Sequence, residues 1–156
     1  MIREYAEAAD RVWAEARMDA GWGGALQARR GELHDVLALP GFVAEEDGGP
    51  RGLATYRVGG DECELAFIEA FERGRGVGTA LLEAVRAAAA GCARIWVVTT
   101  NDNLDALRFY QRRGFRLVAL RPGAVDEARE QLKPRIGRVG AFGIPIRDEL
   151  ELELRL

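Results

Sequence analysis

Three glycines and two arginines alternate near the middle of the chain, in the run Arg73-Gly74-Arg75-Gly76-Val77-Gly78. An alternating, strand-like segment precedes this run, and an apolar helical pattern follows it from Thr79. A strand that turns into a helix in this way leaves backbone N–H groups unused at the first helical turn, where the helix dipole is positive. Such a turn binds anions, and glycine lets phosphate oxygens come close to the backbone. Residues 73–79 therefore predict a site for a phosphate-bearing ligand.

Two other kinds of phosphate-binding loop fit these residues less well. A P-loop ends in Gly-Lys-Ser/Thr, whereas here Gly78 is followed by Thr79 and Ala80. A dinucleotide-binding fingerprint needs a third glycine where Thr79 stands and an acidic residue after the next strand, and residues 97–101 offer none. A tight turn that only starts a helix is the remaining alternative.

Composition limits the classes of protein and partner. A chain of 156 residues with 48% hydrophobic and 30% charged residues predicts one globular domain with a real core. The net charge of -3 argues against a nucleic-acid partner, and no apolar run is long enough to predict a membrane partner. Cys63 and Cys92 lack metal-ligand spacing, so we expect no metal and a reducing, cytoplasmic location.

Hydrophobic periodicity predicts the elements that position the turn. Strand patterns cover residues 2–5, 41–45, 52–58, 62–71, 94–100, 115–120 and 150–156. Helical patterns cover residues 6–20, 33–39, 79–90, 104–110 and 124–132, and a loop follows at 134–148. The first helix is expected to bury one face, made of Ala9, Val12, Trp13, Ala16 and Ala20. The strand–helix–strand order of residues 62–100 predicts a parallel pair of strands.

A second motif lies beyond the glycine turn, and the two together resemble a known family. The chain reads Arg73-x-x-Gly76-x-Gly78 and then Asn103-x-x-Ala106-x-x-x-Tyr110-x-x-x-Gly114-Phe115. This pair, in this strand order, resembles the GCN5-related N-acetyltransferase (GNAT) family over residues 41–121. The resemblance implies an α/β (α+β) fold: a mixed, mostly antiparallel central sheet with a splayed parallel strand pair, flanked by helices. It also implies one acetyltransferase domain over residues 1–156, with residues 122–148 inserted between the last two strands.

The resemblance implies acetyl-coenzyme A as the cofactor. Its pyrophosphate is expected on the backbone of residues 74–79, and its pantetheine arm on the main chain of Ile68 and Ala70. Asn103 is similar to an asparagine that contacts the cofactor arm in this family, although it fits a helix cap equally well. The implied cofactor-binding residues are Ile68, Ala70, Arg73, Gly74, Arg75, Gly76, Val77, Gly78, Thr79, Asn103, Ala106 and Tyr110.

Acetyl transfer to an amine needs a proton donor for the leaving thiolate and an acceptor for the ammonium proton. Tyr110 matches the family's proton-donating tyrosine, and its ordinary pKa of about 10 keeps it protonated at neutral pH. Glu62 and Glu64 are the candidate bases, because strand alternation places them on one face with Ala66 and Ile68. Glu69 then lies on the other face and becomes the candidate if a β-bulge exchanges the faces.

These residues together predict an N-acetyltransferase in which a primary amine attacks bound acetyl-coenzyme A directly. A coenzyme A-binding regulatory module without turnover is one alternative, and an acetyltransferase that acts on proteins or peptides is another. The expected partner is a small-molecule or peptide amine. Residues 150–156 alternate leucine with Glu151, Glu153 and Arg155, so this strand is expected to expose one face, through which the chain could form a homodimer.

Overall fold

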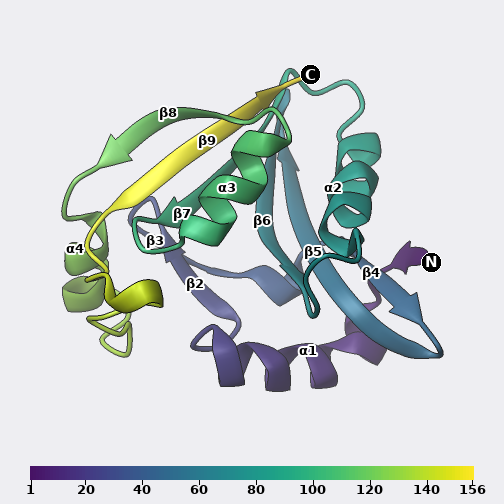
Figure 1. The fold of residues 1–156 in the computed structure, drawn as a ribbon, viewed down its shortest axis with the longest axis horizontal. Coiled ribbons are helices and arrows are strands. Elements are labelled where there is room, and N and C mark those ends of the chain that lie inside the picture. The colour runs from purple at the N-terminus through teal and green to yellow at the C-terminus, as the bar shows by residue number, and fades with distance from the viewer. The chain divides into compact units, whose positions relative to one another are not determined.

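Antiparallel hairpins account for most strands of the structure, a computed structural model that describes residues 1–156. The chain forms two compact units, and Figure 1 labels their helices and strands. The first unit contains residues 1–25, 35–95 and Leu156, and the second contains residues 26–34 and 96–155. The prediction of one domain over residues 1–156 stays a prediction.

Four strands of the first unit lie in the order β1 (Ile2–Glu4), β4 (Gly41–Glu46), β5 (Gly49–Gly59) and β6 (Glu62–Ala70), each antiparallel to the next. Helix α2 (Val77–Ala88) follows β6 and leads to β7 (Arg94–Thr100), whose first two residues still belong to this unit. Strand β7 follows β6 in the strand order. Because a helical crossover joins them, β6 and β7 form the predicted parallel pair.

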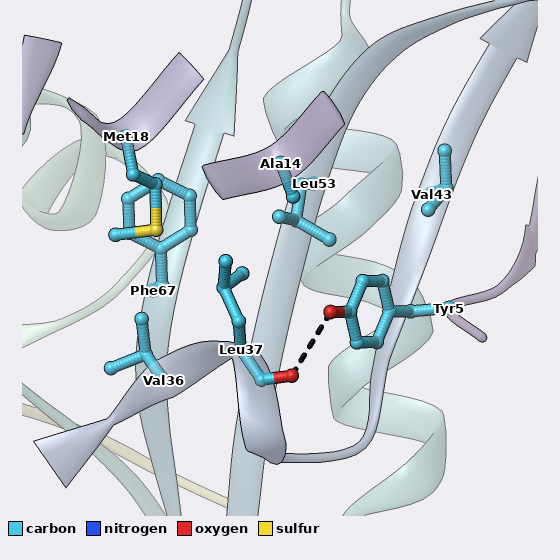
Figure 2. Close-up of a cluster of buried hydrophobic side chains, with 8 residues drawn as sticks. All are labelled: Tyr5, Ala14, Met18, Val36, Leu37, Val43, Leu53 and Phe67. Atoms are coloured by element: carbon cyan, nitrogen blue, oxygen red, sulfur yellow. Dashed lines mark hydrogen bonds between the residues drawn. The ribbon is translucent and has the colours of Figure 1, made fainter. Parts of the chain in front are cut away.

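Helix α1 (Glu7–Gly21) and the short 3-10 helix η1 (Val36–Ala38) cover one face of these strands (Figure 2). The Tyr5 hydroxyl donates to the Leu37 carbonyl at 2.9 Å, so the polar end of this buried tyrosine has a hydrogen-bond partner. The buried cluster consists of Tyr5, Ala14, Met18, Val36, Leu37, Val43, Leu53 and Phe67.

The buried face of α1 differs from the predicted one. Asp10, Ala14 and Met18 are buried, whereas the Val12 side chain is 80% exposed. The prediction from apolar residues failed because it did not allow for a buried carboxylate, that of Asp10, on this face. Arg3 neutralises Asp10 through two donors at 2.8 Å each, and Ala6 N–H and Trp13 Nε1 also donate to its carboxylate. A charged residue thus anchors the start of α1 to β1.

Helix α2 covers the opposite face of β5. A Cβ on Gly52 would come within 2.7 Å of Val77 Cγ1 and 2.9 Å of Leu81 Cδ1, so only glycine lets the first turns of α2 lie this close to the strand. Gly52 thereby fixes where the glycine turn ends and the helix begins.

In the second unit the strand order is β7, β9 (Glu149–Arg155) and β8 (Arg116–Arg121). Helix α3 (Leu104–Arg112) lies between β7 and β8 in the chain, and α4 (Ala124–Gln131) and the 3-10 turn η2 (Ala141–Gly143) follow β8. No helix of the structure has the length and apolarity that a membrane crossing requires.

Two further predictions were wrong. Residues 33–39 do not form one helix, because β2 (Leu26–Arg29) and β3 (Glu32–Asp35) form a hairpin and only the 3-10 helix η1 follows it. Strand β9 does not offer a free edge or a charged outer face, because it lies between β7 and β8 and its Glu149 and Glu151 are buried. Edge-to-edge pairing of two chains through β9 is therefore not available, and a homodimer stays a prediction.

The Asp10 network generates a prediction about stability. Hydrogen bonds from Arg3 lower the pKa of Asp10 from 3.8 to about 2. Its stabilisation is thus complete above the unfolded-state value and is lost as pH falls from about 4 toward 2. We expect Asp10→Ala to lower the free energy of unfolding at neutral pH by about 2–3 kcal/mol, because Arg3 keeps only Glu45 as an acidic partner and Ala6 N–H and Trp13 Nε1 lose their acceptor. Urea unfolding at several pH values measures this.

Glu7→Ala is the matched control, because Glu7 forms only an exposed pair with Arg11 on the same helix. Such pairs contribute less than about 1 kcal/mol. Equal losses in the two variants, or an Asp10→Ala loss that stays constant down to pH 2, would contradict the assignment.

Candidate active site

The glycine turn has the geometry that an anion site requires. Gly74 and Gly76 have φ values of +78° and +75°, and Gly76 is the residue immediately before α2. Side chains with a Cβ rarely adopt this left-handed conformation. The N–H groups of the first turn of α2 have no intrahelical acceptor, and they point toward the same end as the positive helix dipole.

The arginines of the turn are exposed, as a phosphate site needs. Arg75 lies 3.4 Å from carboxylate oxygens of both Glu72 and Glu46. All three side chains are more than half exposed, so these pairs contribute little to stability and are easily exchanged for a phosphate. Arg73 is also exposed. The donor set therefore fits a pyrophosphate.

A β-bulge in β6 decides which way the candidate bases face. Thr55 of β5 pairs with Phe67, but the next residue, Tyr56, pairs with Leu65, so Ala66 is an extra residue in β6. Beyond it the sides exchange. Glu62, Glu64, Phe67 and Glu69 oppose Gly59, Arg57, Thr55 and Leu53, which alternate along β5 and therefore share one face. The prediction that Glu62 and Glu64 lie opposite Glu69, on the face of Ile68, was wrong.

Each of the three glutamates on this face is paired with an arginine. Glu62 accepts from Arg94 Nε at 2.9 Å, and the almost fully buried Glu64 accepts from Arg57 Nη2 at 3.1 Å. Glu69 lies 3.1 Å from Arg17 Nη2 on α1. Arginine side chains thus offset the charge of all three carboxylates on this face of β6.

Ile68 and Ala70 belong to the other face of β6. They pair with Ala54 and Gly52, and Gly52 faces α2. Both are half-buried, and they stand in the last three residues of β6, directly before the turn. The first unit thus brings together the candidate bases, the two main-chain positions and the turn.

The second unit carries the remaining candidates along one side of α3, because Asn103, Ala106 and Tyr110 follow at helical spacing. The side chain of Asn103 accepts from Ala106 N–H at 3.3 Å and donates to Thr99 Oγ1 at 3.2 Å. This confirms that Asn103 caps the helix. Its contact with a cofactor stays a prediction.

Tyr110 is buried between Phe109 and Phe115, with ring centroids 5.5 Å and 5.3 Å away. Burial raises the pKa of Tyr110 well above its ordinary value. No group of the chain accepts a hydrogen bond from its hydroxyl. The side chain therefore holds its proton firmly and keeps its donor for another acceptor.

Residues 122–148 are held against the turn between β7 and α3. Asn101 Oδ1 accepts from Arg147 N–H at 2.9 Å and from Asp148 N–H at 3.0 Å, and Asp102 Oδ2 accepts from Ala141 N–H at 3.0 Å. A Cβ on Gly140 would overlap the Asp102 carboxylate.

Hydrogen bonds within the insert and to β2 also hold it in place. Arg129, buried in α4, donates to the carbonyls of Ile136, Gly137 and Ile146 at 2.7–3.0 Å. Lys133 Nζ donates to the Leu26 carbonyl at 2.6 Å. The insert is therefore an ordered element beside Asn103, although its sequence carries no strong helical or strand pattern after α4.

Sequence reasoning missed the buried charges of the second unit. Glu149 and Glu151 are 3% and 5% exposed and lie beside Arg121, at 3.7 Å and 2.6 Å. The alternation of these glutamates with leucines is typical of a strand that exposes one face to solvent. Their burial depends on Arg121 and Arg30, which lie far away in the sequence. The pairing of β8 with β9 that brings Arg121 to these acids cannot be read from the sequence.

Comparison with known proteins gives concordant results. A profile described as the acetyltransferase (GNAT) family matches residues 2–115. The uncharacterized protein YdhI of Bacillus subtilis is 42% identical over 132 residues, 83% of this chain and 82% of YdhI. The fold resembles an IAA acetyltransferase from Bacillus cereus, with TM-score 0.76, 20% identity and coverage of 100% and 99% of the two chains.

A putative acetyltransferase from Salmonella typhimurium, yncA, was solved with its cofactor acetyl-CoA. It matches with TM-score 0.67 and 21% identity over 100% of this chain and 93% of its own. The predicted fold, a mostly antiparallel sheet with one parallel pair and flanking helices, is thereby confirmed.

The turn generates a prediction about ligand binding. In Gly76→Ala the added Cβ meets no atom of the chain, but it lies where phosphate oxygens approach the backbone. We expect the affinity for coenzyme A to fall roughly 10-fold or more, a loss of about 1.4 kcal/mol or more, in calorimetric titration.

Gly123→Ala is the control, because Gly123 also precedes a helix, with φ +74° and open space around its Cβ. Both variants should lose about 1–2 kcal/mol of stability from the left-handed backbone. If both also bound coenzyme A equally well, the turn would be only a helix start.

Burial also predicts how the tyrosines titrate. The pKa of Tyr5 is raised to about 12, and those of Tyr56 and Tyr110 are also raised by burial. The unfolded chain ionises near the ordinary value of about 10, so the folded state loses stability as pH rises above about 10. Near-ultraviolet absorbance should show tyrosinate in the urea-unfolded chain at a pH where the native chain shows almost none; coincident titration curves would contradict this.

Proposed function

The chain belongs to the GNAT acetyltransferase family, and we propose that it is an acetyl-coenzyme A-dependent N-acetyltransferase whose acceptor is a primary amine. Family membership supports the acetyltransferase activity. The observation that carries the proposal within this chain is Tyr110, a buried hydroxyl that keeps its proton and has no acceptor among the protein's own groups.

In this proposal the cofactor is held by residues of both motifs. The N–H groups of residues 74–79, with Arg73 and Arg75, bind the pyrophosphate. The main chain of Ile68 and Ala70 binds the pantetheine arm in the manner of an added strand. Asn103, Ala106 and Tyr110 are the cofactor contacts that we propose on α3. Bound acetyl-coenzyme A supplies an activated acetyl thioester.

The chain's own groups move the protons. Because the β-bulge exchanges the faces, Glu69 is the base that takes the proton that the ammonium form of the acceptor must lose, directly or through water. Glu62 and Glu64 share its face and are the alternative bases. The free amine then forms the new C–N bond while the C–S bond breaks. Tyr110 donates its proton to the leaving sulfur, and the proton that the nitrogen releases once the amide has formed restores the tyrosine hydroxyl.

We place the acceptor beside the last strands and the ordered insert, residues 122–148. The contacts of Asn101, Asp102 and Arg129 support this, because they fix the insert next to the start of α3. Loops held on a rigid frame commonly set specificity. A cytoplasmic location is also part of the proposal, since Cys63 and Cys92 are free thiols.

Tyr110→Phe tests the proposal. The ring still packs against Phe109 and Phe115, so the fold and the affinity for acetyl-coenzyme A should be unchanged. Without the donor, kcat should fall by about 100-fold, the low end of the effect of a general acid, because the coenzyme A thiolate is a fairly good leaving group. Release of free coenzyme A across a panel of amines measures this.

Phe115→Leu is the packing control, because it disturbs the same ring cluster without removing the hydroxyl. Full kcat in Tyr110→Phe, measured where chemistry limits the rate, would return Tyr110 to a packing role. If wild-type protein binds acetyl-coenzyme A but acetylates no amine or peptide, the alternative of a binding module without turnover holds instead.

A further inference from the structure

Arg30 occupies a backbone position where the fold alone gives no reason for an arginine. It is the first residue of the two-residue turn between β2 and β3, and Arg30 and Gly31 have φ values of +52° and +78°. Turns of this kind favour Asn, Asp or Gly at the first position, because a left-handed backbone strains other residues. A glycine or asparagine would stabilise the hairpin better.

Three contacts hold Arg30 in one orientation. Its N–H donates to the Glu149 carboxylate, 3.1 Å from Oε1 and 3.3 Å from Oε2. Its guanidinium lies over the ring of Trp96, with Cζ 4.6 Å from the centroid. Its Nε lies 3.8 Å from Glu151 Oε1. Backbone, stacking and charge thus fix the side chain before any ligand arrives.

The guanidinium nevertheless has all its donors available. The distance of 3.8 Å to Glu151 is too long for a hydrogen bond, and no other group of the chain accepts from the Arg30 side chain. The side chain is 44% exposed, so these donors reach solvent. A guanidinium that is stacked, oriented and unused is suited to two parallel hydrogen bonds with a carboxylate or phosphate.

The neighbouring charges permit such a ligand. Glu149 and Glu151 are buried, and Arg121 lies 3.7 Å and 2.6 Å from them, so this arginine offsets one of their two negative charges. Arg29, also buried, adds a further positive charge at the end of β2. Three arginines against two glutamates leave an excess positive charge at Arg30. Stacking of the half-exposed guanidinium on the buried Trp96 ring is a gain of the same order as the cost of the strained backbone, so it does not by itself explain an arginine at this position.

We propose that Arg30 is a specificity-determining residue that binds an oxyanion, a carboxylate or a phosphate, on the acceptor amine. This inference rests on the proposed function, because it assigns Arg30 to the acceptor side beside β9. It predicts that the preferred acceptors carry a negative charge several bonds from the amine that is acetylated.

Paired acceptors test the inference. Each ω-amino acid is compared with its carboxamide, and each aminoalkyl phosphate with its amino alcohol, at chain lengths that leave the amine pKa nearly equal within a pair. The wild-type protein should prefer the charged member by about 10–100-fold in kcat/KM, as expected for a hydrogen-bonded charge. The carboxylate and phosphate arms identify which oxyanion is bound.

Variants of Arg30 separate recognition from stability. Arg30→Ala should remove the preference mainly by raising KM for the charged member, with kcat little changed. Arg30→Gly should do the same while raising the unfolding midpoint, because glycine suits the left-handed backbone. Arg30→Lys keeps the charge without the planar fork and should retain part of the preference. Arg116→Ala, an exposed arginine of β8 without an ion pair, should retain all of it.

Equal kcat/KM for charged and neutral members in the wild type, or an unchanged ratio in the folded Arg30 variants, overturns the inference while leaving the acetyltransferase in place. If no amine is acetylated, calorimetric titration of the same pairs into the coenzyme A complex gives a readout that does not need turnover. Binding of the charged members that Arg30→Ala abolishes then supports the oxyanion site without the proposed function, and equal binding of charged and neutral members contradicts it.

Discussion

One extra residue in β6 determines how the first unit presents its chemical groups. Ala66 has no partner across from it on β5, so the side chains before it exchange sides relative to those after it. If Ala66 were instead paired in a regular ladder, Glu62 and Glu64 would point toward α2 and displace the buried Cys63 and Leu65 from that face. The bulge keeps a continuous apolar surface under α2 and a row of carboxylates under α1.

The buried carboxylates described above are paired with arginine side chains. Asp10, Glu64, Glu149 and Glu151 are all buried, and each lies against an arginine. Removing one partner of a buried ion pair strongly destabilises a fold, although the intact pair adds little or no stability compared with apolar residues of the same size. These pairs therefore specify how segments meet, such as α1 against β1 and β8 against β9, more than they add to the total stability. Arg30 and Arg75 differ because their guanidinium groups remain exposed.

The sequence predicted the parts of the fold that follow from periodicity and turn chemistry. The strand of residues 94–100 was predicted to the residue, and the glycine turn and the Asn103 cap were placed correctly, whereas α2 begins at Val77, two residues before its predicted start. It could not predict the bulge at Ala66, because register depends on pairing with a distant strand. The face of α1 was missed for a related reason: Asp10 is buried only because Arg3, on another element, neutralises it. The hairpin of β2 and β3 was missed because its turn carries Arg30-Gly31 in place of the usual asparagine or aspartate.

Lys133 is the only lysine among the 22 basic residues of the chain. A guanidinium stays protonated at physiological pH and is a poor nucleophile, whereas a neutral primary amine attacks a thioester. In a protein that binds an acyl thioester, Lys133 is therefore the only side-chain amine that the thioester can acylate. Burial lowers the pKa of Lys133, while its hydrogen bond to the Leu26 carbonyl holds the nitrogen in place. Accidental acylation would therefore gather at one residue, where it would break the tie between the insert and the start of β2.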